Sequence, residues 1–225
     1  MGEATKEARR VGENVRMNAT LVIFNNMTAL DFVGFYDPVT RLKRMQIMPD
    51  FSWKICALTP TVTDDRGLTF EADSVEQSLA DYDMLFVPGG IGTRSLQIDR
   101  AFIEWLRSFP ATGVAVSVCT GALLLGAAGF LKGKRATTHP RALTDLAPYC
   151  QEVVEQRIVD EGSVITAGGV AASIDLGLYV VERLAGLGTR ARIATQMDYP
   201  YFPSGTTVTQ RESIIPTIHS VPRRS

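Results

Sequence analysis

Short apolar segments alternate with segments of helical periodicity along most of the chain. The pattern predicts strands over 19–24, 53–58, 83–87, 113–118 and 135–139. It predicts helices over about 28–44, 100–109, 120–133 and 170–186, and a hairpin over 153–169 that turns at 160–162. Nearly all-apolar strands that alternate with helices are typical of an α/β fold, with a mostly parallel sheet and helices on both faces.

The pattern extends over one domain. A chain of 225 residues with 45% hydrophobic residues is long enough for a single continuous core. We expect a charged N-terminal tail over 1–17, an α/β domain over 18–203 and an irregular C-terminal tail over 204–225. Residues 200–225 carry four prolines and no periodicity.

Composition and charge predict a protein without a nucleic-acid partner, a signal peptide or a membrane span. The 23 basic and 24 acidic side chains give no positive field for nucleic acid. The start of the chain is charged and lacks the apolar run of a signal peptide, and the apolar run over 122–131 is shorter than the ~20 residues that span a bilayer. Three widely spaced cysteines fit neither a disulfide framework nor a zinc site, so we expect a cytoplasmic protein without metal or cofactor.

Cys119 lies where a predicted strand turns directly into a predicted helix. Such turns lie at the carboxyl edge of a parallel sheet, where α/β folds bind ligands. The sequence Ser-Val-Cys-Thr-Gly over 117–121 has the small residues that a nucleophile elbow requires. We therefore predict that Cys119 is a nucleophile, with its thiol pKa lowered from about 8.5 by the helix N-terminus.

The alternative for any free cysteine is packing in the core. That interpretation suits Cys56, which lies within a predicted strand, and Cys150. For Cys119 it leaves the small flanking residues unexplained.

A nucleophile of this kind needs donors for the charge that develops on its substrate. The backbone N–H of Thr120, at the start of the helix, is one candidate. The second is the turn Gly89-Gly90, which ends its own strand at the same edge. The alternative for this Pro-Gly-Gly sequence is an ordinary tight turn.

Two side chains are candidates for the proton carrier. Asp31 follows the first strand by a few residues, and its alternative role is a helix N-cap. His139 ends the predicted strand 135–139, and its alternative role is to hold the following loop by a hydrogen bond. The sequence does not choose between them, and we assign no role to His219.

Four motifs resemble the ThiJ/PfpI superfamily, and within it the isonitrile hydratases. They are LDFVG (30–34), PGGIGT (88–93), SVCTGALLLGAAGFLKGKRATTH (117–139) and ITAGGVAASIDLGL (165–178). The resemblance implies a flavodoxin-like three-layer sandwich, a homodimer, and a cysteine nucleophile beside an acid from the first βα connection. In the hydratase branch that acid is an aspartate, which Asp31 matches, and Thr120 matches the residue after the nucleophile.

Two departures narrow the function that the resemblance implies. Members with peptidase or glyoxalase activity carry histidine after the cysteine or glutamate in the first βα turn, where this chain has Thr120 and Asp31. Regulators of the AraC type carry the same cysteine motif before a helix-turn-helix region. Because the sequence ends at Ser225 without such a region, we do not expect a regulator.

The resulting hypothesis is a cofactor-free enzyme that adds water to an isonitrile and yields an N-substituted formamide. Cys119 attacks the terminal carbon while Asp31 delivers a proton to it, and water then attacks the thioimidate. The alternatives are a thiol that senses oxidants or electrophiles without turnover, and an enzyme that hydrolyses amides or processes aldehydes.

Overall fold

The computed structural model describes residues 16–200 and 206–208. Its main sheet has eight strands in the order β12-β10-β11-β7-β6-β1-β2-β5. All neighbours pair in parallel except the β10–β11 hairpin. The strands are β1 (Met17–Val22), β2 (Phe51–Ala57), β5 (Ser74–Val75), β6 (Met84–Val87), β7 (Val114–Val118), β10 (Ile158–Asp160), β11 (Val164–Ala167) and β12 (Thr206–Val208). A separate two-stranded sheet joins β3 (Thr61–Thr63) and β4 (Thr69–Glu71).

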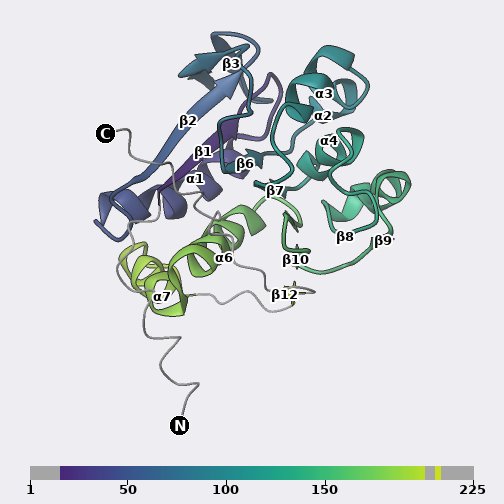
Figure 1. Cartoon of the computed structure of the whole chain (residues 1–225). Helices are drawn as coiled ribbons and strands as arrows, with labels where there is room; N and C mark the ends of the chain where they lie inside the picture. Colours follow the sequence, from purple (N-terminus) through teal and green to yellow (C-terminus); the bar gives the residue numbers. More distant parts are fainter. Residues whose placement is uncertain (1–15, 201–205, 209–225) are drawn as a thin grey trace, which may run out of the picture.

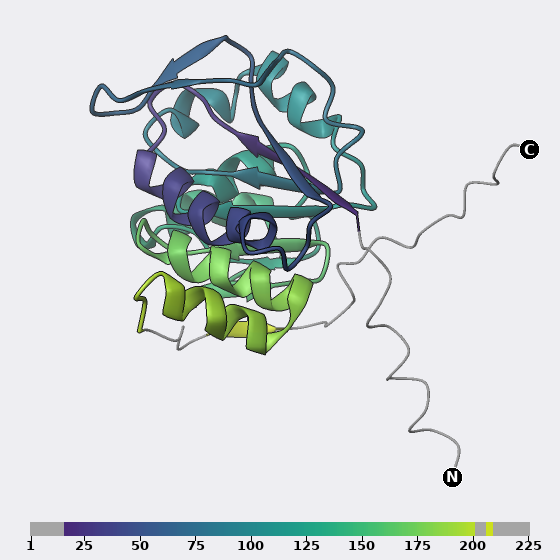
Figure 2. The same ribbon diagram turned by 90° about the vertical axis from the view of Figure 1, so that its left-hand side faces the viewer.

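Helices cover both faces of the sheet (Figure 1), as the sequence predicts for a three-layer α/β sandwich. One face carries α1 (Ala29–Arg44), α6 (Ala172–Ala185) and α7 (Leu187–Gln196), which lie side by side in Figure 2. The other face carries α2 (Thr93–Leu96), α3 (Arg100–Arg107) and α4 (Gly121–Ala127), with α5 (Leu143–Leu146) packed on α4. Two 3₁₀ turns, η2 (Pro140–Ala142) and η3 (Ala147–Tyr149), flank α5.

The central strands are buried on both faces, which explains their continuous apolar sequence. Every residue of β6 and of β7 is buried. The ring of Phe86 in β6 stacks on that of Phe35 in α1 with their centroids 3.9 Å apart. Helix α1 is therefore fixed directly on the centre of the sheet.

Small residues let α1 and α6 cross at close range. A Cβ atom on Gly34 would lie 2.1 Å from Ser173 Oγ, and one on Gly177 would lie 2.4 Å from Pro38 Cγ. The hydroxyl of Ser173 donates a hydrogen bond to the carbonyl of Leu30 at 3.1 Å. This contact fixes the first turn of α1, from which Asp31 projects.

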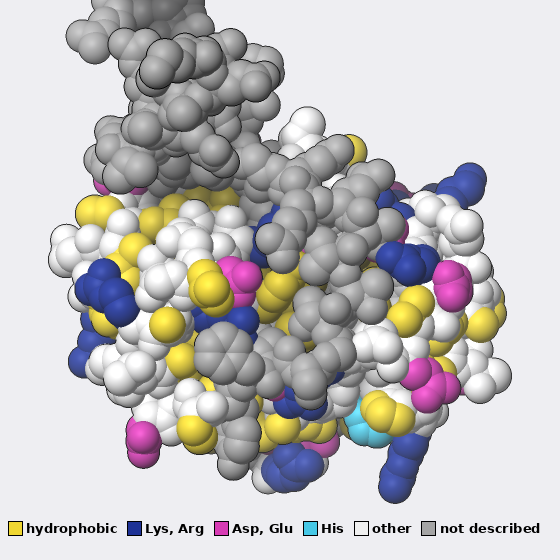
Figure 3. All heavy atoms as spheres, turned by 90° about the horizontal axis from the view of Figure 1, so that it is seen from below, with side chains coloured by type: hydrophobic (Ala, Val, Ile, Leu, Met, Phe, Trp, Pro, Cys, Tyr) yellow, Lys and Arg dark blue, Asp and Glu magenta, His cyan; other side chains and the backbone are white. Residues whose placement is uncertain are grey.

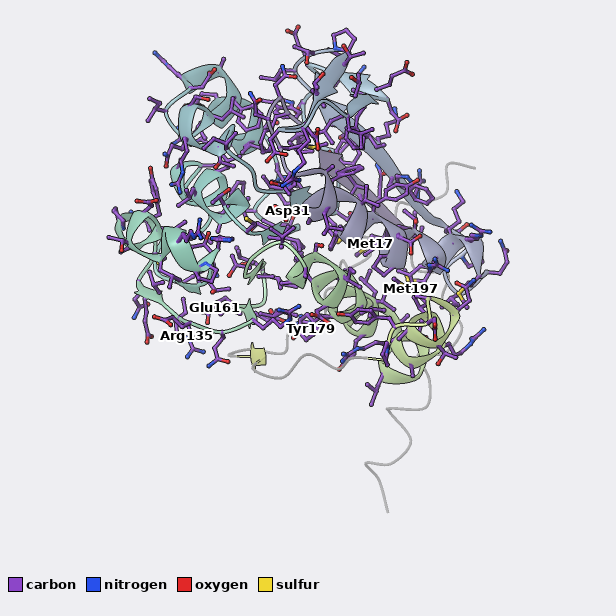
Figure 4. All side chains as sticks on the ribbon, turned by 180° about the vertical axis from the view of Figure 1, so that it is seen from behind. Met17, Asp31, Arg135, Glu161, Tyr179 and Met197 are labelled. Atoms are coloured by element: carbon purple, nitrogen blue, oxygen red, sulfur yellow. The ribbon has the colours of Figure 1, made fainter. Side chains whose placement is uncertain are left out.

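The buried carboxylate of Asp160 links the β10–β11 hairpin to α6. The hydroxyl of Tyr179, labelled in Figure 4, donates to Asp160 Oδ2 at 2.7 Å. The guanidinium of Arg183 pairs with the same carboxylate, which is fully buried. The hairpin that the sequence predicts over 153–169 forms over 158–167, with its turn where the sequence predicts it and its strands held from the helix side; Val153 pairs with another strand.

The expected strand 135–139 is wrong in extent and in place. Only β8 (Arg135–Ala136) forms, and it pairs with β9 (Glu152–Val153) in a small sheet of its own. The position beside β7 in the main sheet is taken by β11. The backbone N–H of Thr137 bonds instead to the side chain of Thr166, at 2.9 Å.

Helix boundaries and the tail also differ from expectation. Helix α4 ends at Ala127, well before residue 133, because Gly129 takes a φ of 94° that a helix cannot contain. Helix α7 follows α6 and was not anticipated. Thr206–Val208, expected to be part of an irregular tail, forms β12 by parallel pairing with β10. Residues 1–15 and 209–225, with most of both expected tails and His219, lie outside the described residues.

The face of the molecule seen from below in Figure 3 is mixed in charge. On the face shown in Figure 3, lysine and arginine side chains alternate with acidic and apolar ones. Within residues 16–200 and 206–208, no helix is long and apolar enough to cross a membrane.

The α1–α6 crossing yields a prediction about stability. Gly177→Ala places a methyl group against Pro38, so we expect the free energy of unfolding in urea to fall by about 1–3 kcal/mol. The matched control is Gly188→Ala in α7, where a Cβ meets nothing within 4 Å, and stability there rises by about 0.4–1 kcal/mol. Equal effects of the two substitutions would contradict the close crossing.

Candidate active site

The turn from β7 into α4 has the geometry of a nucleophile elbow. Cys119 follows the last residue of β7 and has a φ of 56°, in the left-handed region. Its N–H donates to the carbonyls of Ala167 at 3.0 Å and Gly168 at 2.8 Å, both at the end of β11. Its carbonyl accepts a hydrogen bond from Thr138 Oγ1 at 2.7 Å. Hydrogen bonds therefore hold both sides of the strained residue.

Asp31 lies in the first turn of α1 and points into the same site. Figure 4 shows it near the middle of the molecule, and its side chain is fully buried. Its Oδ2 accepts a hydrogen bond from the N–H of Gly89 at 2.9 Å, and the same oxygen lies close to the side chain of Cys119. The N-cap interpretation is wrong, because the N-cap residue is Thr28.

Gly89 brings the nucleophile and the carboxyl together. A Cβ at Gly89 would lie 2.6 Å from Thr120 N, 2.7 Å from Cys119 Cβ and 2.8 Å from Asp31 Oδ2. Its carbonyl accepts a hydrogen bond from the N–H of Thr28 at 2.9 Å. Only glycine fits at this point, because any side chain would separate the three groups.

Thr120 binds the next peptide of the same turn. The N–H of Gly90 donates to Thr120 Oγ1 at 3.0 Å, and the Thr120 hydroxyl is 3.1 Å from the carbonyl of Gly90. Gly90 has a φ of 133°, and a Cβ there would meet the backbone of Met27 at 2.6 Å. The Pro-Gly-Gly turn is therefore part of the site as well as a tight turn.

Burial raises the pKa of Asp31 to about 7, nearly to neutrality. The N–H of Gly89 and the thiol of Cys119 oppose the shift, and the charge of Asp65 adds slightly to it. The second carboxyl oxygen, Oδ1, is buried without a hydrogen-bond partner within the described residues. A carboxyl in this state exchanges its proton in the neutral pH range.

The expected low pKa of the Cys119 thiol is wrong. Burial and the charge of Asp31 raise that pKa to about 12, and the nearby N–H of Thr120 opposes the shift. Helix α4 has only seven residues, so its dipole does not outweigh the burial of the thiol and the charge of Asp31. Above about pH 7 the pair therefore consists of a carboxylate and a protonated thiol.

His139 lies near the elbow, and its side chain contacts Arg141 and Gly169. Its Nδ1 accepts a hydrogen bond from the N–H of Arg141 at 3.2 Å, and its ring packs against Gly169. The bond to Arg141 is the loop-holding role that the sequence offers as the alternative for this histidine. The structure thus places Asp31, rather than His139, beside the Cys119 side chain.

The other cysteines lie apart from this arrangement. Cys56 is buried in β2 with its sulfur 3.6 Å from the hydroxyl of Tyr82, and Cys150 lies beside the carbonyl of Leu146. All three cysteines are free thiols. Across the described residues, no group of three or more His, Cys, Asp or Glu side chains could hold a metal ion.

The DJ-1/PfpI family matches residues 17–183, which contain the elbow, Asp31 and the Gly89-Gly90 turn. The chain belongs to the DJ-1/PfpI family. The resemblance seen in the sequence motifs is thereby confirmed, and the mostly parallel sandwich is the flavodoxin-like fold of its structural neighbours.

Relatives of this DJ-1/PfpI chain have different names. An isonitrile hydratase from Pseudomonas putida is 36% identical over 199 residues, which cover 86% of this chain and 85% of that protein. The HTH-type transcriptional regulator CdhR from Pseudomonas aeruginosa is 31% identical over 179 residues, 78% of this chain and 53% of the regulator. The crystal structure of a ThiJ/PfpI family protein from Pseudomonas syringae, 28% identical, superimposes with a TM-score of 0.77, covering 90% of this chain and 83% of that one.

Two features of this DJ-1/PfpI site escaped the sequence interpretation. One is Thr138, whose hydroxyl binds the elbow from a segment outside the main sheet. The other is the N–H of Gly89, which binds Asp31. Thr138 is next to the candidate His139, but nothing in the local pattern shows where its hydroxyl points.

The raised pKa of Asp31 predicts a pH-dependent stability. The unfolded carboxyl ionises near its ordinary value of 3.8 and the folded one near 7, so burial of Asp31 destabilises the fold progressively as pH rises between these values. Asp31→Asn removes this loss. We expect the melting temperature of the variant, relative to the unchanged protein, to rise between about pH 4 and about pH 8. A difference that is constant over this range would contradict the assignment.

Proposed function

We propose that this protein is an isonitrile hydratase, a lyase that converts isonitriles to N-substituted formamides with Cys119 as nucleophile. The observation that carries the proposal is the fully buried carboxyl of Asp31 beside the Cys119 side chain, with a pKa raised to about 7. The likeness to the isonitrile hydratase of Pseudomonas putida over most of both chains supports it.

The first step adds the thiol across the terminal carbon of the isonitrile. The Asp31 carboxylate takes the proton of Cys119 as the sulfur bonds to that carbon, and then delivers the same proton to the carbon. The product is a thioimidate, in which the carbon carries one hydrogen and is doubly bonded to nitrogen. Asp31 ends the step as a carboxylate, as it began. A thiol with a high pKa needs such a base within hydrogen-bond reach.

The second step hydrolyses the thioimidate. Asp31 takes a proton from water as the water oxygen bonds to the carbon, and the nitrogen receives that proton. The carbon–sulfur bond then breaks, the hydroxyl proton returns to the sulfur, and the formamide leaves. No cofactor enters this sequence, because water supplies both hydrogens and the oxygen of the product.

Thr120 and Gly90 complete the proposed machinery. The N–H of Thr120 faces the thiol and lies where charge develops during addition. The N–H of Gly90 is engaged by the Thr120 hydroxyl, so in this scheme it holds Thr120 and reaches a substrate only when that hydroxyl turns away.

The pKa of the thiol favours this enzyme over a sensor. Oxidation and alkylation need the thiolate, which a pKa of about 12 makes rare at neutral pH. A relay that moves the proton only when a substrate is bound does not need a standing thiolate. The pair is therefore better suited to turnover than to sensing.

The substrate we propose is a small molecule, and the protein is proposed to be a cytoplasmic homodimer without a nucleic-acid partner. The near balance of 23 basic and 24 acidic side chains supports the absence of a nucleic-acid role. Free thiols at Cys56, Cys119 and Cys150 support a reducing compartment.

Replacement of each cysteine tests the nucleophile. With a simple alkyl isonitrile and formamide followed by NMR, Cys119→Ala should abolish turnover, because no other thiol contacts Asp31. The matched controls Cys56→Ala and Cys150→Ala should retain most of the rate. Turnover by Cys119→Ala at the unchanged rate would end the proposal, and formation of an acid or amine from amide or aldehyde substrates alone would point to the other enzyme class.

Kinetics of two further variants test the proton carrier. Asp31→Asn keeps the size of the side chain and removes the base, so kcat should fall by about 10²–10⁴-fold. In the unchanged protein kcat/KM should rise with pH through about 7 as Asp31 ionises, and Asp31→Asn should lose this limb. His139→Asn should keep both rate and profile. The reverse pattern would identify a Cys–His enzyme and refute the hydratase mechanism.

A further inference from the structure

The carbonyl of Cys119 has an unusual partner. Helix α4 begins at Gly121, and its first turn uses the carbonyl of Thr120, which accepts from the N–H of Leu123 at 3.1 Å. The carbonyl of Cys119 lies before the helix and is bound by Thr138 Oγ1 at 2.7 Å, the hydrogen bond that the structure gives it. Both residues are buried, with Thr138 1% exposed. A buried carbonyl without a hydrogen-bond partner destabilises the fold. The hydrogen bond from the Thr138 hydroxyl therefore stabilises the elbow.

The same hydrogen bond determines where the next N–H points. The carbonyl of Cys119 and the N–H of Thr120 belong to one planar trans peptide, so they point in opposite directions. With the carbonyl fixed on Thr138, the N–H is directed to the other side of the chain. That side is the site, because the nitrogen of Thr120 lies 2.6 Å from the position of a Cβ on Gly89.

Thr138 is itself held in place. The preceding residue, Thr137, donates its N–H to Thr166 Oγ1 in β11 at 2.9 Å. The neighbouring end of β11 accepts the N–H of Cys119 through the carbonyls of Ala167 and Gly168. The end of β11 therefore fixes both the elbow at Cys119 and Thr138, whose hydroxyl binds the elbow.

We propose that Thr138 is a positioning residue that aims the Thr120 N–H at the Cys119 sulfur and at the reacting carbon through the peptide between Cys119 and Thr120. Its hydroxyl acts on the chemistry without touching the substrate. Donation to the carbonyl also polarises this peptide and strengthens its N–H as a donor. The inference rests on the proposed role of Cys119 as nucleophile.

The test compares three threonine variants with the unchanged protein. Thr138→Val removes the hydroxyl and keeps the shape, and Thr138→Ser keeps the hydroxyl. Thr137→Val is the matched control, since it makes the same change in a neighbouring buried threonine whose backbone N–H still binds Thr166. Circular dichroism and thermal melting establish that each variant is folded.

The first readout is the rate at which iodoacetamide alkylates Cys119, followed by mass spectrometry of the peptide that contains it. When the Thr120 N–H no longer points at the sulfur, it stabilises the Cys119 thiolate less and the pKa of the thiol rises. A rise of one pKa unit lowers the thiolate fraction, and with it the alkylation rate, about tenfold. We expect the alkylation rate to fall about tenfold in Thr138→Val and to return nearly to that of the unchanged protein in Thr138→Ser. In Thr137→Val we expect no loss of rate. An unchanged or faster rate in folded Thr138→Val overturns the proposal.

The second readout is turnover of an alkyl isonitrile. Thr138→Val should lower kcat by about 10- to 100-fold with little change in KM, because the aimed donor acts in the transition state. If the unchanged protein shows no turnover, the proposed function fails while the alkylation rates still decide the role of Thr138. If Thr138→Val does not fold, Thr138→Ala is measured in its place; if that variant also fails to fold, the hydroxyl serves the stability of the fold and the positioning role is refuted.

Discussion

The left-handed backbone of Cys119 is the constraint around which the site is built. A non-glycine residue with a φ of 56° is strained by about 1–2 kcal/mol, and it persists only where its surroundings hold it. Here two carbonyls of the β11 end accept its N–H, and the Thr138 hydroxyl binds its carbonyl. A regular helical turn would place the side chain elsewhere. The left-handed backbone conformation of Cys119 therefore directs its thiol toward the carboxyl of Asp31.

Once the thiol is placed, the protonation state of the pair follows from burial. Both groups lose solvation, so the carboxyl gives up its proton near pH 7 while the thiol keeps its own to about pH 12. Such a pair holds a proton that either heavy atom can carry during a reaction. It differs from a cysteine activated by a helix dipole, in which the thiolate exists before substrate arrives.

Local sequence patterns predict the parts of this molecule that local forces determine. The apolar strands, the helices α1 and α6, and the elbow at Cys119 follow from periodicity and from small residues beside the turn. The errors concern partners distant in the sequence. Thr206–Val208 becomes a strand because β10 offers a free edge, and Arg135–Ala136 pairs with β9 because β11 already occupies the place beside β7. The pKa of the thiol was misjudged for the same reason, since it depends on burial and on a carboxyl 88 positions earlier in the chain.

The identity of the residue after the nucleophile has a structural consequence beyond its chemistry. The Thr120 hydroxyl is both an acceptor from the N–H of Gly90 and a donor to its carbonyl. A single oxygen atom can make both contacts to one residue, whereas the two nitrogens of an imidazole lie on different sides of a ring. The Thr120 hydroxyl shares the carbonyl of Gly90 with the N–H and hydroxyl of Thr93, which bind it at 3.2 and 2.8 Å. Thr120 and Asp31 therefore bind neighbouring peptides of one turn, because the N–H of Gly90 donates to the threonine hydroxyl and the N–H of Gly89 donates to the carboxyl.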